Sequence, residues 1–393
     1  MGAIKPKVMA WARETAGLSL DQAARALGLS IKSGAKRLAS LEEGIEEPSR
    51  PLLLNMAKAY RRPLIAFYMA EPPPQGDRGT DFRTLPGGDR QHPEVDVLVR
   101  DITARQGLIR SMLEDDETPP VDFIGVVTTE MPPKVLAERI AKRIGFSLPE
   151  FRATKGVDEA FTHLRGRIED AGVFVLLLGN LGSYHTQIPV ELFRGFALAD
   201  RVAPLIVIND QDASTARSFT ALHELVHLWL GATGISGADT RNGVEQYCNE
   251  VAAEILLPAL EVQTRTWTDG ANLFERAVQE IAAFADARRV SRTMVAYRLL
   301  RTGIVPYKVW ADIDAYFTEQ WVQYKQREAE KNKAAEGGPG YYMVRRHRIG
   351  PALLGLVRRS LDEGNITYTK ASRVLGVNPR SVEPLLSTLR GVR

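Results

Sequence analysis

The chain has 393 residues, with 51 Lys and Arg against 48 Asp and Glu, so its net charge is +3. At about 150 residues per domain, this length predicts two to four domains that each bury a core. The single Cys excludes an intramolecular disulfide framework and a four-cysteine zinc site, and it favours a reducing cytoplasm. No apolar run approaches the roughly 18 residues of a membrane span, and the N-terminus has no secretory apolar region.

The first 70 residues show helical periodicity interrupted by short turns. Ser19 is a plausible N-cap for a helix over 20–27, and Ser30 for a helix over about 31–41. A third amphipathic helix is expected over 51–60. This pattern is typical of a small helix-turn-helix domain over 1–70.

The middle of the chain combines helices with a few strands. A Pro- and Gly-rich linker is expected over 71–92, followed by mostly helical sequence up to about 172. Short apolar runs then predict strands at 173–179, 193–199 and 204–209, the last two forming a hairpin. We expect a mainly α fold with a small antiparallel β-sheet (α+β), and an exposed edge strand within 193–209.

Helices are expected over most of the remaining chain. The predicted organisation is a central domain over 93–270, a helix-turn-helix-like region over 271–330, a linker over 331–340 and a small helical domain over 341–393. In the second of these regions, Ser291 is expected to cap a helix. We assign no activity to the last domain.

The motif that carries chemistry is His223-Glu224-Leu225-Val226-His227, an H-E-x-x-H pattern inside a long apolar helix. Residues i and i+4 share a helix face, so both imidazoles reach one ion at about 2.0–2.1 Å. Glu224 is then placed to take the proton of a metal-bound water. A catalytic zinc also needs a third protein ligand.

The segment 244–258 offers the third ligand. Glu245, Cys248, Asn249 and Ala252 follow the spacing i, i+3, i+4, i+7 and therefore share a face. Glu245 is the favoured ligand. Cys248 and the loop residue Asp239 are the alternatives, whereas Glu250 and Glu254 are expected to meet solvent on another face.

These motifs resemble a known family. The run R-S-F-T-A-L-H-E-L-V-H followed by E-Q-Y-C-N-E-V-A-A-E-I-L-L-P is similar to the ImmA/IrrE metallopeptidases. The resemblance implies that 93–270 is a zincin-like metallopeptidase domain. It also implies one zinc per chain, held by His223, His227 and Glu245, with Glu224 as the catalytic residue. It also implies limited proteolysis of a repressor or similar regulator in a stress, phage or mobile-element response.

The N-terminal segment resembles the XRE class of helix-turn-helix domains, which occurs fused to such peptidases. Its second helix would present Lys32, Ser33, Lys36 and Arg37 to operator DNA, although a following acidic run weakens this basic stripe. A protein-docking or purely structural role remains open. The alternative function is therefore a DNA-binding regulator or antitoxin that binds a cognate toxin, with secondary or no peptidase activity.

Overall fold

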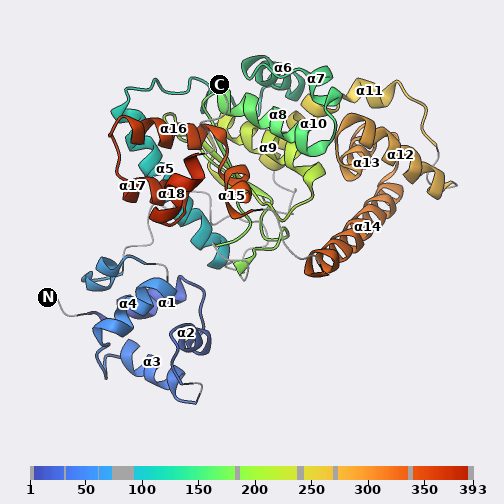
Figure 1. The fold of residues 1–393 in the computed structure, drawn as a ribbon. Helices are drawn as coiled ribbons and strands as arrows, with labels where there is room; N and C mark the ends of the chain where they lie inside the picture. The colour runs from blue at the N-terminus through green and yellow to red at the C-terminus, as the bar shows by residue number, and fades with distance from the viewer. Residues whose placement is uncertain are drawn as a thin grey trace.

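The computed structural model describes residues 4–30, 32–60, 62–72, 93–181, 186–236, 243–268, 273–334 and 340–387. Most of the expected linker over 71–92 lies outside these ranges, as do residues 335–339 of the linker expected over 331–340. Within the described ranges the protein is mainly helical with one small sheet, as the sequence predicts (Figure 1). In the same ranges, no helix combines the length and apolar character that crossing a bilayer requires.

The N-terminal helices form a group with its own apolar core (Figure 1). Ser19 caps the second helix through a reciprocal capping box with Gln22, as predicted. The next helix begins at Gly34 with Ser33 as its N-cap, so the expected cap at Ser30 is wrong. The elements are α1 (Pro6–Glu14), α2 (Leu20–Ala26), α3 (Gly34–Glu42), α4 (Arg50–Ala59) and the 3₁₀ helix η1 (Leu64–Tyr68).

The sheet lies at the centre of the rest of the chain. Its order is β1-β3-β2-β4, and its strands are β1 (Phe174–Leu177), β2 (Gly195–Leu198), β3 (Leu205–Ile208) and β4 (Gly234–Ser236). The expected hairpin is confirmed, because β2 and β3 pair in antiparallel register with Phe196 opposite Val207.

Two sequence expectations about the sheet need correction. The sheet is mixed, because β1 pairs with β3 in parallel. The hairpin inserts β3 between β1 and β2, and the apolar runs alone do not reveal strand order. The same order gives β2 and β3 a partner on each side, so neither strand within 193–209 is an edge; the edges are β1 and β4.

Alternate residues of the strands face two different apolar cores, which explains why the strands read as continuous apolar runs. One face, with Val175, Ala197 and Ile206, packs against a helical layer around α8, α9 and α10. This layer contains α6 (Pro133–Arg143), α7 (Leu148–Ala153), α8 (Val157–Asp170), α9 (Ser214–Leu230), α10 (Gly243–Leu256), α11 (Ala259–Gln263), α12 (Phe274–Arg288), α13 (Arg292–Arg301) and α14 (Tyr307–Ala334).

The opposite face of the sheet, with Leu176, Phe196 and Val207, packs against α5 and the C-terminal helices. These elements are α5 (Pro93–Asp115), α15 (Tyr341–Ile349), α16 (Pro351–Asp362), α17 (Tyr368–Leu375) and α18 (Pro379–Ser387). Segments from the two ends of this region therefore share one core (Figure 1). The domain boundaries expected from the sequence stay a prediction.

A buried ion pair anchors the C-terminal helices to the layer beneath them. Arg165 and Glu169 of α8 are 4% and 8% exposed, and their Nε–Oε1 distance is 2.9 Å. Arg165 donates to the carbonyl of His347, and Glu169 accepts from the backbone N–H of Ala352 at 3.1 Å. A side chain at Gly350 would collide with both charged groups, so glycine is required at this close approach.

Candidate metal centre

The two histidines of the motif lie one turn apart on α9, as predicted. His223 and His227 are 5% and 3% exposed, and Glu224 between them is fully buried. The residues of α9 from Thr220 to Trp229 are all buried, because the helix is covered by the sheet, by α8 and by α10. The site therefore sits on a helix whose position is fixed from several sides.

The third side chain of the cluster comes from α10. Cys248 and Ala252 on the α10 face are fully buried, and their small side chains allow α10 to lie close to α9. This approach places Glu245, one turn before Cys248, against both imidazoles. The Nε2 atom of His223 lies 3.1 Å from Oε2 of Glu245, and Nε2 of His227 lies 3.2 Å from Oε1.

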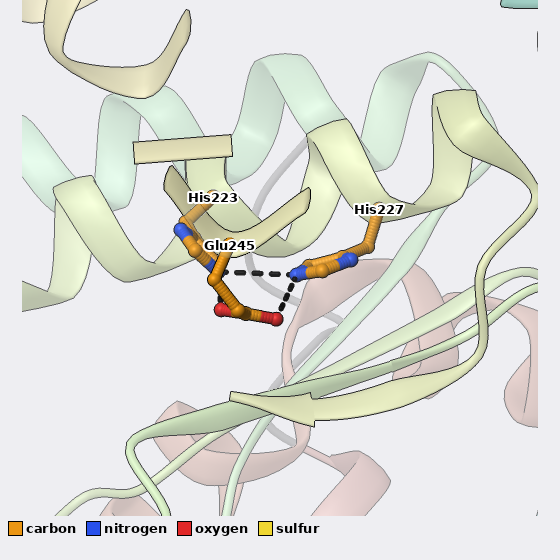
Figure 2. Close-up of side chains that lie close together, drawn as sticks. All are labelled: His223, His227 and Glu245. Atoms are coloured by element: carbon orange, nitrogen blue, oxygen red, sulfur yellow. Dashed lines mark hydrogen bonds and ion pairs between the residues drawn. The ribbon is translucent and has the colours of Figure 1, made fainter. Parts of the chain in front are cut away.

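The donor atoms fit a zinc ion. Figure 2 shows the two imidazoles and the carboxylate converging, and the two Nε2 atoms are 3.1 Å apart. Tetrahedral ligands at about 2.0–2.1 Å from zinc lie roughly 3.4 Å from one another, so an outward shift of a few tenths of an ångström would admit the ion. Among the described residues, His223, His227 and Glu245 form a group that could hold a metal ion.

The charges of the cluster suit cation binding. Burial acts to raise the pKa of Glu245, but hydrogen bonds from His223 and His227 outweigh it and lower that pKa to about 2. Glu245 is therefore an anion at neutral pH. Burial acts to lower the pKa of His227, but contacts with the Cys248 thiol and the Glu245 carboxylate raise it well above its ordinary value.

Strand β2 fits closely against Glu224. A Cβ atom at Gly195 would lie 2.7 Å from Oε1 of Glu224 and 2.8 Å from Cγ2 of Thr220, one turn earlier on α9. Real Cβ atoms essentially never show contacts this short. The absence of a side chain at Gly195 therefore sets how near α9 and its carboxylate lie to the sheet, a role that the sequence analysis missed.

The C-terminal end of α9 is held by a loop from earlier in the chain. The backbone N–H groups of Gly125 and Val126 donate to the carbonyls of Leu228 and Trp229, both at 3.0 Å. Gly231 ends the helix at φ 69°, and a Cβ there would lie 2.8 Å from Cα of Gly125. This contact requires glycine and fixes the turn that follows His227.

The other candidate ligands do not join the cluster. The Cys248 thiol packs beside His227, and burial raises its pKa. Asp239 lies outside the described residues. Glu250 and Glu254 lie on another face of α10, as expected, and both remain partly exposed. They also form ion pairs with Arg301 and Arg298 of α13, respectively, which helical periodicity alone does not reveal.

Ser291 caps α13 as expected, accepting from the backbone N–H of Met294 at 3.1 Å.

The residues expected to contact DNA lie far from α9 in the sequence, at the start of α3. Lys32, Ser33, Lys36 and Arg37 are all exposed. Arg37 lies 3.7 Å from Glu46, so the acidic run does neutralise part of this surface, as the sequence suggested.

The comparison with protein families bears on the same helices. Residues 183–300 match a peptidase family model, the IrrE N-terminal-like domain. The matched range includes α9 and α10, and with them the whole histidine and carboxylate cluster. The domain is thus an IrrE-like peptidase domain with a candidate metal site. No curated protein and no solved structure matched the chain.

The family match covers neither end of the chain. Neither the N-terminal helices nor residues 341–393 fall within 183–300. The helix-turn-helix interpretation of residues 1–70, the operator DNA and the toxin partner therefore stay predictions.

Proposed function

We propose that this protein is a zinc-dependent endopeptidase that cleaves a transcriptional repressor or a similar regulator. The observation that carries the proposal is the convergence of His223, His227 and Glu245 beside Glu224, within the range that matches the peptidase domain. Two imidazoles and one carboxylate are a donor set of catalytic zinc sites, which keep a further position for water or substrate.

The zinc site and Glu224 would have different roles in the reaction. A zinc ion in this cluster would polarise the scissile carbonyl and lower the pKa of a bound water to about 7. Glu224 would accept the proton of the attacking water and return it to the leaving amine. Glu224 is fully buried and lies between the two histidines in the sequence of α9, so its side chain is held in place beside the cluster.

The decisive variant is Glu224→Gln, which keeps the shape of the side chain but cannot accept a proton. We expect normal zinc content, an unchanged melting temperature and at least a 100-fold loss of peptidase activity, the contribution typical of general acid–base catalysis. Glu275→Gln on the exposed first turn of α12 is the matched control and should retain full activity. Undiminished cleavage by Glu224→Gln would remove this residue from the mechanism.

The substrate requires a separate experiment. Regulators encoded near the gene would be incubated with the full chain, with zinc or with a chelator, and the products read by intact mass. A single zinc-dependent cut in one regulator supports the proposal. If every such regulator stays intact while the zinc-loaded protein is folded, the repressor is not the substrate.

A second candidate function rests on the exposed cations of α3. Lys32, Lys36 and Arg37 favour a DNA-binding regulator or antitoxin that recognises operator DNA and a cognate toxin, with the peptidase secondary or absent. Its test is whether a neighbouring toxin co-purifies with the chain and is inhibited by it. This candidate fails if Glu224→Gln abolishes the cellular response while toxin and DNA binding are absent.

A further inference from the structure

The C-terminal helices carry an excess of basic over acidic residues, unlike the chain as a whole. Over the whole chain basic and acidic residues are nearly balanced. In 341–387 the acidic residues are Asp362, Glu363 and Glu383, whereas the basic residues are Arg345, Arg346, Arg348, Arg358, Arg359, Lys370, Arg373 and Arg380. Such a local excess is the electrostatic feature expected of a surface that binds polyanions.

The last two helices are joined as in a helix-turn-helix. Thr367 caps α17, accepting from the backbone N–H of Lys370 at 3.2 Å, and α17 ends at Gly376 with φ 64°. Only residues 376–378 separate α17 from α18, which begins with Pro379. A turn of three or four residues containing glycine is the connection found in DNA-binding helix-turn-helix units.

The unit is held rigidly on the rest of the protein. Val374 and Leu375 of α17 and Val382 and Leu385 of α18 are buried in the core that also contains α5 and one face of the sheet. Arg358 of α16 donates to the carbonyl of Leu386 at 3.3 Å, which ties α16 to the end of α18. The packing fixes both helices and leaves their outer faces in solvent.

The outer faces carry side chains suited to DNA. Asn378 and Arg380, at the beginning of α18, are exposed, and Arg373 of α17 is exposed beside the half-exposed Lys370. Within the described part of the chain, none of these three basic residues belongs to an ion pair, whereas Arg358 is paired with Asp362. Their charges are therefore available to a ligand.

The acidic residue of α18 is engaged elsewhere. The Tyr368 hydroxyl donates to Oε2 of Glu383 at 2.9 Å, which holds that carboxylate toward the beginning of α17. The first turn of α18 thus presents positive charge. In helix-turn-helix proteins this turn of the second helix contacts base edges in the major groove.

We propose that α17 and α18 form a second nucleic-acid-binding site, specific for duplex DNA, on the face of the protein that covers the sheet opposite α9. Lys370 and Arg373, three residues apart on one face of α17, pair with phosphates. Asn378 and Arg380 reach base edges, where amide and guanidinium groups form bidentate hydrogen bonds with adenine and guanine. The proposal does not depend on the peptidase activity.

The test uses the full chain with the substitutions Lys32→Ala, Lys36→Ala and Arg37→Ala as background, so that the predicted contact of α3 is removed. Binding of a labelled mixed-sequence duplex of about 20–30 base pairs is followed by fluorescence anisotropy from about 50 to 200 mM salt. Adding Lys370→Ala, Arg373→Ala and Arg380→Ala should weaken binding at least tenfold. The slope of log affinity against log salt should fall by about one for each lost phosphate contact.

A matched control removes three exposed cations elsewhere, with Lys134→Ala, Lys142→Ala and Arg276→Ala in the same background. We expect this control to bind DNA as the background does, and all variants to keep their zinc content and melting temperature. A milder variant, Arg380→Gln, should weaken binding even if the triple change impairs folding.

Several outcomes overturn the proposal. The first is that the background protein does not bind DNA, and the second is that the control variant loses as much DNA affinity as the α17–α18 variant. The third is that the salt slope of the α17–α18 variant equals that of the background protein. The fourth is that the protein binds single-stranded RNA more tightly than the duplex. Loss of peptidase activity in Glu224→Gln with DNA binding intact would separate this proposal from the proposed function.

Discussion

Glycine at position 195 should be required for catalysis although it has no functional group. In Gly195→Ala the new methyl group would lie 2.7 Å from Oε1 and 3.0 Å from Cγ of Glu224, and 2.8 Å from Cγ2 of Thr220. Ordinary van der Waals contacts begin at 3.4 Å, so the carboxylate or the whole of α9 must move away from β2 by roughly 0.7 Å.

The expected magnitude follows from that displacement. A misplacement of about 1 Å in a catalytic group can cost about 100-fold in rate, so kcat/KM should fall by about 10- to 100-fold. Overpacking a core costs about 1–3 kcal/mol, and replacing glycine in a strand returns roughly 0.5–1 kcal/mol. The free energy of unfolding should therefore decrease only by about 0.5–2 kcal/mol.

The assay is cleavage of the regulator identified by the mass screen, with zinc content measured on the same samples. Gly166→Ala is the control, because Gly166 lies on α8 with nothing within 4 Å of an added Cβ. It should keep full activity. The reasoning is wrong if Gly195→Ala has wild-type kcat/KM at full zinc occupancy, or if its activity falls only in proportion to lost zinc.

Two further predictions concern the cluster and the buried ion pair. His223→Ala should lose most of its zinc in metal analysis, whereas Cys248→Ala should keep it; the reverse result would make the thiol the ligand. Glu169→Ala should lower the free energy of unfolding in urea by about 3–5 kcal/mol, because it leaves the charge of Arg165 buried and unpaired. Replacing the pair together by Met and Leu should recover only the part of that loss that comes from the unpaired charge, because the carbonyl of His347 and the N–H of Ala352 also lose their partners. A double variant no more stable than Glu169→Ala would contradict this explanation.

The candidate metal-binding group was predictable from the sequence because its constraints are local. His223 and His227 are placed by the period of one helix, and Glu245 is placed by the period of the next. Only the docking of α9 on α10 remained to be supplied, and the small buried residues Cys248 and Ala252 indicated which faces meet. The ion pairs of Glu250 and Glu254 were not foreseen, because their partners lie on α13, which no local pattern connects to α10.

Strand order and the close contact at Gly195 were not predictable from local sequence patterns. Apolar runs identify strands that are buried on both faces, but they contain no information about which strand lies between which. β4 is three residues long and carries no alternating pattern, so the sheet edge it forms was missed. The close fit at Gly195 is recognisable only once the carboxylate of Glu224 is seen against it.

The sheet separates the two apolar cores and contributes side chains to both of them. Residues of β2 alternate between the core beneath α9 and the core beneath the C-terminal helices: Ala197 belongs to the first, and Phe196 to the second. Gly195 of the same strand contacts Glu224. Strand β2 thus contributes side chains to both cores and also sets the position of Glu224 through Gly195. Because packed cores tolerate little change in volume, the close fit of β2 against α9 and the packing of its other face against the C-terminal helices constrain each other.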